Sequence, residues 1–370
     1  MKRILVIAGT RPEAIKLAPV VHELRRRELC RVILCATAQH RQMLDQVLEI
    51  FELKPDMDLD LMTPGQSLSD LTARLFEKLP AAIRQARADC VVVQGDTTTA
   101  FASAVSAFYE RVPVAHVEAG LRTRDIYAPF PEEVNRRLVA QVARWHFAPT
   151  ERARQNLLRE GIAARNIYVT GNTVVDALLA VVPTVHGLPD HLQPPPGSRL
   201  VLVTGHRRES FGAGMRQICE ALAEIAAIHP DAYLVYPVHP NPNVLEPVNE
   251  LLGNIPNIRL VEPVDYPTFI ALMMEAHFII SDSGGVQEEA PALGKPVLVT
   301  REMTERPEAV EAGCARLVGP DKEAIVRAAR ELFDNPQVYA RMAQAKNPFG
   351  DGHAAEQIAS VLEHDLLMEG

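Results

Sequence analysis

The chain has 370 residues, of which 47% are hydrophobic, and this length and composition suit two globular domains rather than one. The formal net charge of −9 argues against nucleic acid or an anionic membrane surface as the main partner. Five scattered cysteines without a C-x-x-C spacing give neither a disulfide framework nor a zinc site. The scattered cysteines suit a reducing cytoplasm, where we expect the protein. No apolar run is long enough to span a bilayer.

Short apolar runs alternate with amphipathic helical patterns along the whole chain. Near-continuous apolar strands with helical crossovers predict parallel sheets covered on both faces, and about a dozen strands suit two doubly wound, Rossmann-like domains of the α/β class. Strands are expected at 4–8, 31–36, 90–94, 113–117, 146–148, 167–170, 200–204, 233–237, 258–260, 278–280, 296–299 and 315–318. Helices are expected at 14–27, 41–51, 69–86, 98–109, 131–143, 151–160, 215–228, 266–275 and 322–333. By composition the linker is 182–198, with 171–173 as a second candidate.

One stretch, Ser281-Asp-Ser-Gly-Gly-Val-Gln-Glu-Glu289, follows an apolar strand and leads into a helical pattern. A helix start presents unpaired N–H groups, and Gly284 and Gly285 would let an anion approach them. Glu289 falls on the same helix face as Gly285, one turn further in, where it would suit a ribose. The local pattern fits an ordinary N-cap by Asp or Ser equally well.

Charged and hydroxyl residues also follow several other strands, where open α/β sheets bind ligands. Arg11 and Lys16 flank a helix start and suit phosphate contacts. Asp96 fits a helix N-cap. Glu118 directly follows a buried strand, where an unpaired carboxylate is costly. Glu132, in a first helical turn, fits either a dipole partner or a functional acid.

Three histidines lie within predicted strands or in the turns that follow them. The arginines at 207 and 208 would lower the pKa of His206 and favour a neutral imidazole. His116 lies within a strand and is expected to be a core residue. His239 lies in a proline-rich turn, where a structural role is as reasonable as a functional one. The chain has no P-loop, dinucleotide fingerprint, nucleophile elbow or metal-ligand spacing, so neither a cofactor nor a metal is expected.

Nine ordered motifs resemble those of the non-hydrolysing UDP-N-acetylglucosamine 2-epimerases of bacteria, over a range from Lys2 to about Gly352. The motifs are Gly9-Thr-Arg-Pro-Glu-Ala-Ile-Lys16, Thr37-Ala-Gln-His-Arg41, Gly95-Asp-Thr-Thr-Thr99, His116-Val-Glu-Ala-Gly-Leu-Arg122, Phe130-Pro-Glu-Glu133, Gly171-Asn-Thr173, Thr204-Gly-His-Arg-Arg-Glu-Ser-Phe211, Asp282-Ser-Gly-Gly285 and Glu305-Arg-Pro-Glu308.

The resemblance implies a fold like that of the GT-B glycosyltransferases, with the site in the cleft between two domains. In such proteins the first domain ends near Gly171. We therefore expect an N-terminal domain of residues 1–171 plus 353–370 and a C-terminal UDP-binding domain of residues 172–352. The final helix, 354–367, would cross back onto the N-terminal domain, and a homodimer is expected.

The resemblance also implies roles for individual residues. Asp96, Glu118 and Glu132 match catalytic carboxylates, and Lys16 matches the lysine of the site. Phe269 matches the uracil pocket, in which Val264 stands where relatives often have Gln. The UDP contacts carried over by motif are Arg11, His206, Ser283, Gly284, Gly285, Glu289 and Arg306.

Bacterial members of this family resemble one another in a second, activating UDP-sugar site next to the first. The chain has all the residue types of that site, which predicts activation by the substrate, although Gly65 stands where some relatives carry a basic residue. The matching residues are Gln39, His40, Gln42, Glu132, Arg207 and His239.

The implied activity is reversible epimerisation of UDP-N-acetylglucosamine to UDP-N-acetylmannosamine, for surface polysaccharide synthesis, through elimination and re-addition of UDP. The sequence leaves open which of four groups takes the C2 proton: Asp96, Glu118, Glu132 or His206. Three alternatives remain: a glycosyltransferase that uses a UDP-sugar donor, an epimerase of a related UDP-2-acetamido sugar, and a UDP-sugar sensor without activity.

Overall fold

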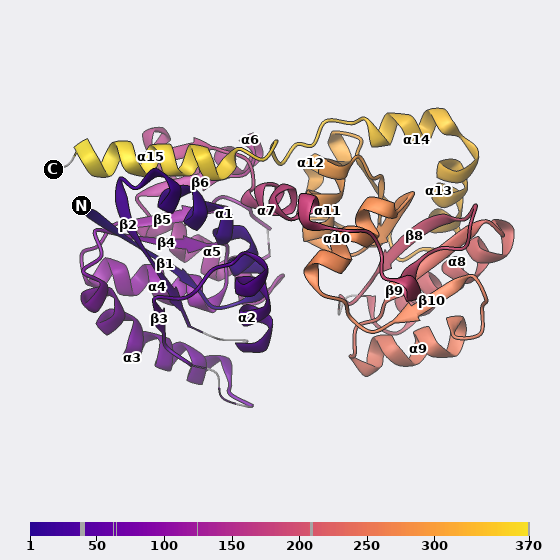
Figure 1. The fold of residues 1–370 in the computed structure, drawn as a ribbon, viewed down its shortest axis with the longest axis horizontal. Coiled ribbons are helices and arrows are strands. Elements are labelled where there is room, and N and C mark those ends of the chain that lie inside the picture. The colour runs from indigo at the N-terminus through magenta and orange to yellow at the C-terminus, as the bar shows by residue number, and fades with distance from the viewer. Residues whose placement is uncertain (38–40, 62, 64, 124, 208–209, 369–370) are drawn as a thin grey trace. The chain divides into compact units, whose positions relative to one another are not determined.

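The chain forms two compact units, which Figure 1 shows as ribbons coloured along the sequence. The computed structural model describes residues 1–37, 41–61, 63, 65–123, 125–207 and 210–368. Unit 1 comprises Met1–Ala177 and Phe349–Gly370, and unit 2 comprises Leu178–Pro348. These limits fall a few residues from the predicted ones, and the proline-rich stretch 182–198 lies inside unit 2. Among the described helices, none combines the length and the apolar character that a membrane span requires.

Unit 1 is built on a seven-stranded parallel sheet with the order β3-β2-β1-β4-β5-β6-β7. The strand order reverses between β1 and β4, which places a topological switch point there. The strands are β1 (Lys2–Ala8), β2 (Cys30–Ala36), β3 (Met57–Asp58), β4 (Cys90–Gln94), β5 (Val114–Val117), β6 (Trp145–Ala148) and β7 (Ile167–Val169). The helices are α1 (Arg11–Arg27), α2 (Arg41–Ile50), α3 (Leu68–Ala86), α4 (Thr98–Tyr109), α5 (Glu132–Val142), α6 (Glu151–Arg159), α7 (Thr173–Val181, which crosses the limit) and α15 (Ala354–Met368).

Unit 2 repeats this design with a six-stranded parallel sheet in the order β10-β9-β8-β11-β12-β13. Its switch point lies between β8 and β11. The strands are β8 (Arg199–Thr204), β9 (Ala232–Pro237), β10 (Ile258–Val261), β11 (Phe278–Ser281), β12 (Val297–Val299) and β13 (Ala315–Leu317). The helices are α8 (Ala213–Ile228), α9 (Pro242–Leu252), α10 (Tyr266–Glu275), α11 (Gly284–Glu289), α12 (Pro307–Glu311), α13 (Lys322–Asp334) and α14 (Pro336–Ala343).

The predicted α/β class with two doubly wound sheets is confirmed, and every predicted strand is present within a residue or two. In the described part of the chain, one strand and four α-helices were missed: β3, α7, α9, α12 and α14. The last three begin with a proline at the first helical position, where its missing N–H costs nothing, but the proline at 242 was interpreted as part of a turn. The short β3 joins the sheet through two residues only.

The last helix, α15, packs on α1 in unit 1, and Figure 1 shows it in yellow along that unit. Its inner face is apolar and fully buried at Ile358, Ala359 and Leu362. The guanidinium of Arg27 on α1 binds the carboxylate of Glu363 at 2.9 Å. Unit 1 is therefore made from both ends of the chain.

Candidate active site

The carboxylate of Glu118 lies just beyond the carboxyl end of β5. Lys16 forms an ion pair with its Oε2, and Nδ2 of Asn172 donates to the same oxygen at 2.6 Å. Nε2 of Gln94 donates to Oε1 at 3.1 Å. The side chain is 7% exposed, and the backbone φ of 62° lies in the left-handed region that non-glycine residues seldom occupy. Three donors thus hold a nearly buried carboxylate on a residue whose backbone is strained. This arrangement is typical of functional sites.

A second carboxylate, that of Glu13, fixes the turn after β1. Its Oε2 accepts from the N–H groups of Gly9 and Thr10 and from the Thr10 hydroxyl, at 2.8 to 3.0 Å. Its Oε1 accepts from the hydroxyl of Thr97 at 2.6 Å. Burial raises the pKa of Glu13 to about 7, although these hydrogen bonds act in the opposite direction. Glu13 therefore ties the turn after β1 to the turn after β4, and so fixes the start of α1, where Lys16 lies.

Asp96, on the turn after β4, forms an ion pair with Arg136 of α5. The guanidinium of Arg136 also lies 3.5 Å from the buried carboxylate of Glu133. Nδ2 of Asn135 donates to the backbone carbonyl of Asp96 at 3.0 Å. The first two turns of α5 therefore hold both the backbone and the side chain of Asp96.

The prediction that Asp96 caps α4 is wrong. The N-cap is Thr97, whose hydroxyl accepts from the N–H of Ala100 at 3.0 Å. The Asp96 side chain is consequently available for its ion pair with Arg136, rather than for the helix start. Glu132 is the first residue of α5, as expected. His116 is fully buried, with Nε2 at 2.8 Å from the carbonyl of Gly95, which confirms its role in the core.

In unit 2, two neighbouring strands bring the predicted loops together. Thr204 at the end of β8 is paired with Ser281 at the end of β11. Oδ2 of Asp282 accepts from the N–H groups of His206 and Arg207, both at 2.7 Å. Because Asp282 is buried and bound to this neighbouring loop, it does not cap α11. Its function in the structure is to join the loop after β8 to the loop after β11.

The start of α11 is open in the way that the two glycines predict. Ser283 occupies the N-cap position, but its side chain makes no capping hydrogen bond. A Cβ added at Gly285 would lie 3.5 Å from Oε2 of Glu289, which confirms that these two residues share a face. Oε1 of the same carboxylate accepts from the hydroxyl of Tyr266 at 2.7 Å. Phe269 follows Tyr266 on α10 and is partly buried.

Arg306 lies against the same helix start. A Cβ added at Gly284 would be 3.5 Å from the guanidinium carbon of Arg306. The Nε of Arg306 donates to Glu288 at 2.7 Å, and its Nη1 donates to Glu305 at 3.0 Å. The two carboxylates fix the orientation of the guanidinium beside the first turn of α11, where the N–H groups of a helix favour an anion.

The ring of His206 is partly exposed and stacks on that of His239, with centroids 5.7 Å apart and planes inclined by 16°. Burial lowers the pKa of His206, and the charge of Arg207 lowers it further, whereas Asp282 acts in the opposite direction. The predicted direction of the shift is confirmed. The predicted cause is not the main one, because burial contributes more than the neighbouring arginine.

The predicted activator residues are only partly covered by the structure. Gln39 and His40 lie outside the described residues, and so does the side chain of Gln42. Arg207 and His239 are in unit 2 beside His206. The predicted residues that the structure describes are divided between the units: Arg11, Lys16, Asp96, Glu118 and Glu132 belong to unit 1, and His206, Arg207, His239, Phe269, Ser283, Gly284, Gly285, Glu289 and Arg306 belong to unit 2.

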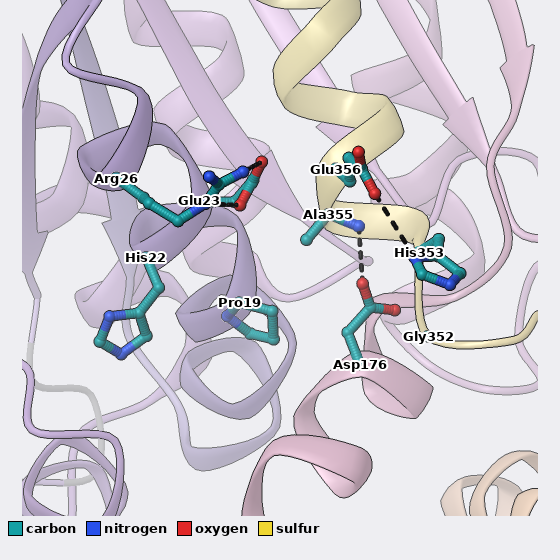
Figure 2. Close-up of a pocket in the computed structure, with 9 residues that line it drawn as sticks. All are labelled: Pro19, His22, Glu23, Arg26, Asp176, Gly352, His353, Ala355 and Glu356. Atoms are coloured by element: carbon teal, nitrogen blue, oxygen red, sulfur yellow. Dashed lines mark hydrogen bonds and ion pairs between the residues drawn. The ribbon is translucent and has the colours of Figure 1, made fainter.

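A pocket of about 480 Å³ in unit 1 lies beside α1 and the first turn of α15 (Figure 2). Within it, Oδ1 of Asp176 accepts from the N–H of Ala355 at 2.8 Å, and His353 lies 3.4 Å from the carboxylate of Glu356. The pocket contains none of the predicted site residues; its lining is Pro19, His22, Glu23, Arg26, Asp176, Gly352, His353, Ala355 and Glu356. Over the described part of the chain, no group of His, Cys, Asp and Glu side chains is arranged to hold a metal ion.

Sequence reasoning missed most of the residues that hold the site residues in place: Glu13, Gln94, Arg136, Asn172, Tyr266, Asp282 and Glu288. Two of them had a usable signal. Gln94 ends a buried strand at the ligand-binding edge, and Arg136 follows Glu132 by one helical turn. The contact of Asn172 with Glu118 joins residues 54 positions apart, and no local pattern predicts it.

Comparison with known proteins identifies the family of the chain. A family model described as UDP-N-acetylglucosamine 2-epimerase matches residues 22–363. The UDP-N-acetylglucosamine 2-epimerase of Escherichia coli (strain K12) is 52% identical over 374 residues, which cover 99% of each chain. The crystal structure of UDP-GlcNAc 2-epimerase from Neisseria meningitidis bound to UDP-GlcNAc is 47% identical, with a TM-score of 0.91 over 98% of this chain and 99% of that chain.

A more distant structure supports the fold alone. The glycotransferase of kitacinnamycin superimposes with a TM-score of 0.67 at 14% identity, over 99% of both chains. The GT-B-like, two-domain α/β fold that was expected is therefore confirmed. Since the family model spans most of the sequence and the identity to the Escherichia coli enzyme extends over nearly all of it, the chain belongs to the UDP-N-acetylglucosamine 2-epimerase family.

Proposed function

We propose that the protein interconverts UDP-N-acetylglucosamine and UDP-N-acetylmannosamine by inverting C2 of the sugar. Membership of the family supports this substrate pair. The observation that carries the proposal is the nearly buried carboxylate of Glu118, held by Lys16, Gln94 and Asn172. Simple transfer of a sugar to an acceptor would not require this carboxylate together with Asp96 and Glu132.

The proposed reaction proceeds by elimination and re-addition. The C2 proton is not next to a carbonyl group, so its simple removal would leave an unstabilised carbanion. UDP instead leaves C1 with the electron pair of the C1–O bond while a base takes the C2 proton, and a glycal with a C1–C2 double bond forms. The UDP oxygen then adds back to C1, and a proton is delivered to the opposite face of C2. This sequence requires a base, an acid and a site that stabilises the leaving diphosphate.

We assign the diphosphate to unit 2, at the first turn of α11 beside Arg306, and Arg11 remains a proposed UDP contact. The N–H groups of that turn and the guanidinium of Arg306 offer positive charge without a metal ion. Glu289 would bind the ribose, and Phe269 would line the uracil site. We propose Asp96, Glu118, Glu132 and His206 as candidates for moving the proton. Burial lowers the pKa of His206, which favours a neutral imidazole.

We also propose how the enzyme is regulated, where it acts and what its product is used for. UDP-N-acetylglucosamine would also activate the enzyme through Gln39, His40, Gln42, Arg207 and His239. The stacking of His239 on His206 offers a direct route from activator to active site. We propose a cytoplasmic homodimer that supplies surface polysaccharide synthesis. All five cysteines are free thiols and buried, which suits a reducing compartment.

One assay tests the proposal: purified protein and UDP-N-acetylglucosamine in deuterated water, without acceptor or NAD. We expect UDP-N-acetylmannosamine with deuterium at C2. Asp96→Asn and Glu118→Gln should each retain UDP binding and lose nearly all of this exchange. A protein that forms no epimer and exchanges no deuterium at excess substrate would overturn the proposal. Activity only with an added acceptor would instead identify a glycosyltransferase, and binding without chemistry a sensor.

A further inference from the structure

Asn172, at the start of α7, uses both the oxygen and the nitrogen of its buried side-chain amide in hydrogen bonds. Asn172 is 1% exposed and directly precedes this helix. Its Oδ1 accepts from the N–H of Val174 at 3.2 Å and so satisfies an amide of the first turn. Its Nδ2 donates to Oε2 of Glu118 at 2.6 Å. The orientation of the amide is therefore fixed, because only the nitrogen can donate to a carboxylate.

The backbone of Asn172 is held by the segment of chain that returns from unit 2. Its N–H donates to the carbonyl of Phe349 at 2.6 Å. Gly171 and Gly350 have φ angles of 86° and 117°, and a Cβ added to either would meet the other segment at 3.1 to 3.2 Å. The two segments approach this closely only because neither glycine has a side chain. The position of Asn172, and with it the donor to Glu118, is thereby set by a contact between two segments of unit 1.

Oε2 of Glu118 thus receives one charged and one neutral donor, Lys16 and Asn172. A lysine ammonium is a point charge on a flexible stem and gives little directional control. The capped amide of Asn172 is rigid by comparison and defines the plane in which the carboxylate lies. A misplacement of about 1 Å in a reacting group is enough to reduce turnover by about a hundredfold.

We propose that Asn172 is a positioning residue that holds Glu118 for transfer of the C2 proton and links it to the contact between Gly171 and Gly350. This inference rests on the proposed function, which gives Glu118 a part in that proton transfer. A purely structural role, as the N-cap of α7, makes different predictions.

Two substitutions separate these roles, because each keeps the cap. Asn172→Ser retains a capping oxygen but has no donor long enough to reach Glu118. Asn172→Asp retains both the cap and the length but places a second carboxylate against Oε2. Asp176→Asn is the matched control, since Asp176 lies one turn further along α7 and binds the N–H of Ala355 instead.

The experiment measures kcat, KM and the pH dependence of deuterium incorporation at C2, together with the melting temperature. For Asn172→Ser we expect kcat to fall by about tenfold to a hundredfold, with KM and the melting temperature nearly unchanged. For Asn172→Asp, the pH–rate profile should move to higher pH, because a second carboxylate beside Oε2 of Glu118 disfavours its charged form. Asp176→Asn should keep the wild-type profile.

Two results would overturn the inference, and they differ from each other. If both Asn172 variants keep the wild-type kcat and pH profile while Glu118→Gln is inactive, Asn172 only caps the helix and the proposed function stands. If Glu118→Gln is itself fully active, the role of Glu118 in the proposed function is wrong, and the inference falls with it.

Discussion

The hydroxyl group of Tyr266 donates a 2.7 Å hydrogen bond to Oε1 of Glu289, and both side chains are buried. The other carboxylate oxygen lies 3.5 Å from the position of a Cβ on Gly285. Tyr266 therefore fixes the carboxylate that we assign to the ribose, on the helix face that begins at the proposed diphosphate site.

Replacement of Tyr266 by Phe should weaken UDP binding by up to about tenfold, since one neutral hydrogen bond contributes about 0.5–1.5 kcal/mol. Calorimetric titration with UDP measures the change. Tyr339→Phe is the control, because it removes a hydroxyl from a ring of the same unit that stacks on His277 at 4.3 Å. Equal losses in the two variants would contradict a specific role for Tyr266.

Replacement of Gly285 by Ala should weaken UDP binding without lowering the stability of the fold. The added methyl would be in ordinary contact with Glu289 and with Oγ of Ser283 at 3.8 Å, and alanine is a better helix former than glycine. The melting temperature should therefore stay the same or rise. The methyl would also occupy space above the first turn of α11, so UDP affinity should fall by about tenfold or more. Unchanged affinity would place the diphosphate elsewhere.

Arg136 and Arg137 provide a matched pair, because both form ion pairs with the buried carboxylate of Glu133. The Arg136 side chain is 5% exposed and also holds Asp96, whereas that of Arg137 is 40% exposed. Arg136→Gln should lower the free energy of unfolding by about 1–3 kcal/mol and abolish C2 exchange, since it removes the ion-pair partner of Asp96 while Glu133 keeps Arg137. Arg137→Gln should cost about 1 kcal/mol or less. Urea unfolding and the exchange assay provide the two readouts, and similar values for both variants would refute the distinction.

The stability of unit 1 should depend on the titration of Glu13. The pKa of Glu13 is about 7 in the folded protein, above the ordinary value of 4.5. Between pH 4.5 and 7 the folded state therefore keeps the carboxyl proton that the unfolded state has lost. The stabilising contribution is complete below pH 4.5 and is lost as the pH rises through 7. Relative to Glu13→Gln, the wild-type free energy of unfolding should therefore fall across this range by a few kcal/mol, on the order of 3.

The control for this prediction is Glu23, whose pKa a hydrogen bond from Arg26 lowers to about 2. Its contribution is present above pH 4.5 and is lost as the pH falls towards 2, which is the opposite behaviour. Glu23→Gln and the wild type should therefore run parallel between pH 4.5 and 7. Parallel curves for Glu13→Gln and the wild type in this interval would show that Glu13 does not titrate there.

The fold was largely predictable because parallel strands in a covered sheet are apolar on both faces. The exceptions show what composition does not encode. Lys2 and Arg3 belong to β1 because they pair in register with Cys30 and Arg31, although neither is apolar. The short strand β3 exists only through its pairing with β2. Pairing between distant segments, and not local hydrophobicity, decides such ends.

The predictable part of the site was the set of residues at the carboxyl ends of strands, since those ends share one edge of a parallel sheet. The polar residues that hold this set in place were not predictable, because their contacts join distant segments. Arg136 meets Asp96 across 40 positions of sequence, and Asp282 meets the N–H of His206 across 76. Their geometry depends on how helices and loops pack, which a single sequence does not reveal.

Because α15 completes unit 1, the order of synthesis differs from the order in which the two units can finish folding. Unit 2 ends at Pro348, so all of its strands have been made before the last helix is translated. Until residues 354–368 leave the ribosome, α1 has no partner for its contact with α15, and Arg27 lacks the carboxylate of Glu363. The face of α1 that packs on α15 can therefore be covered only after residues 354–368 have been made, later than every strand of unit 2.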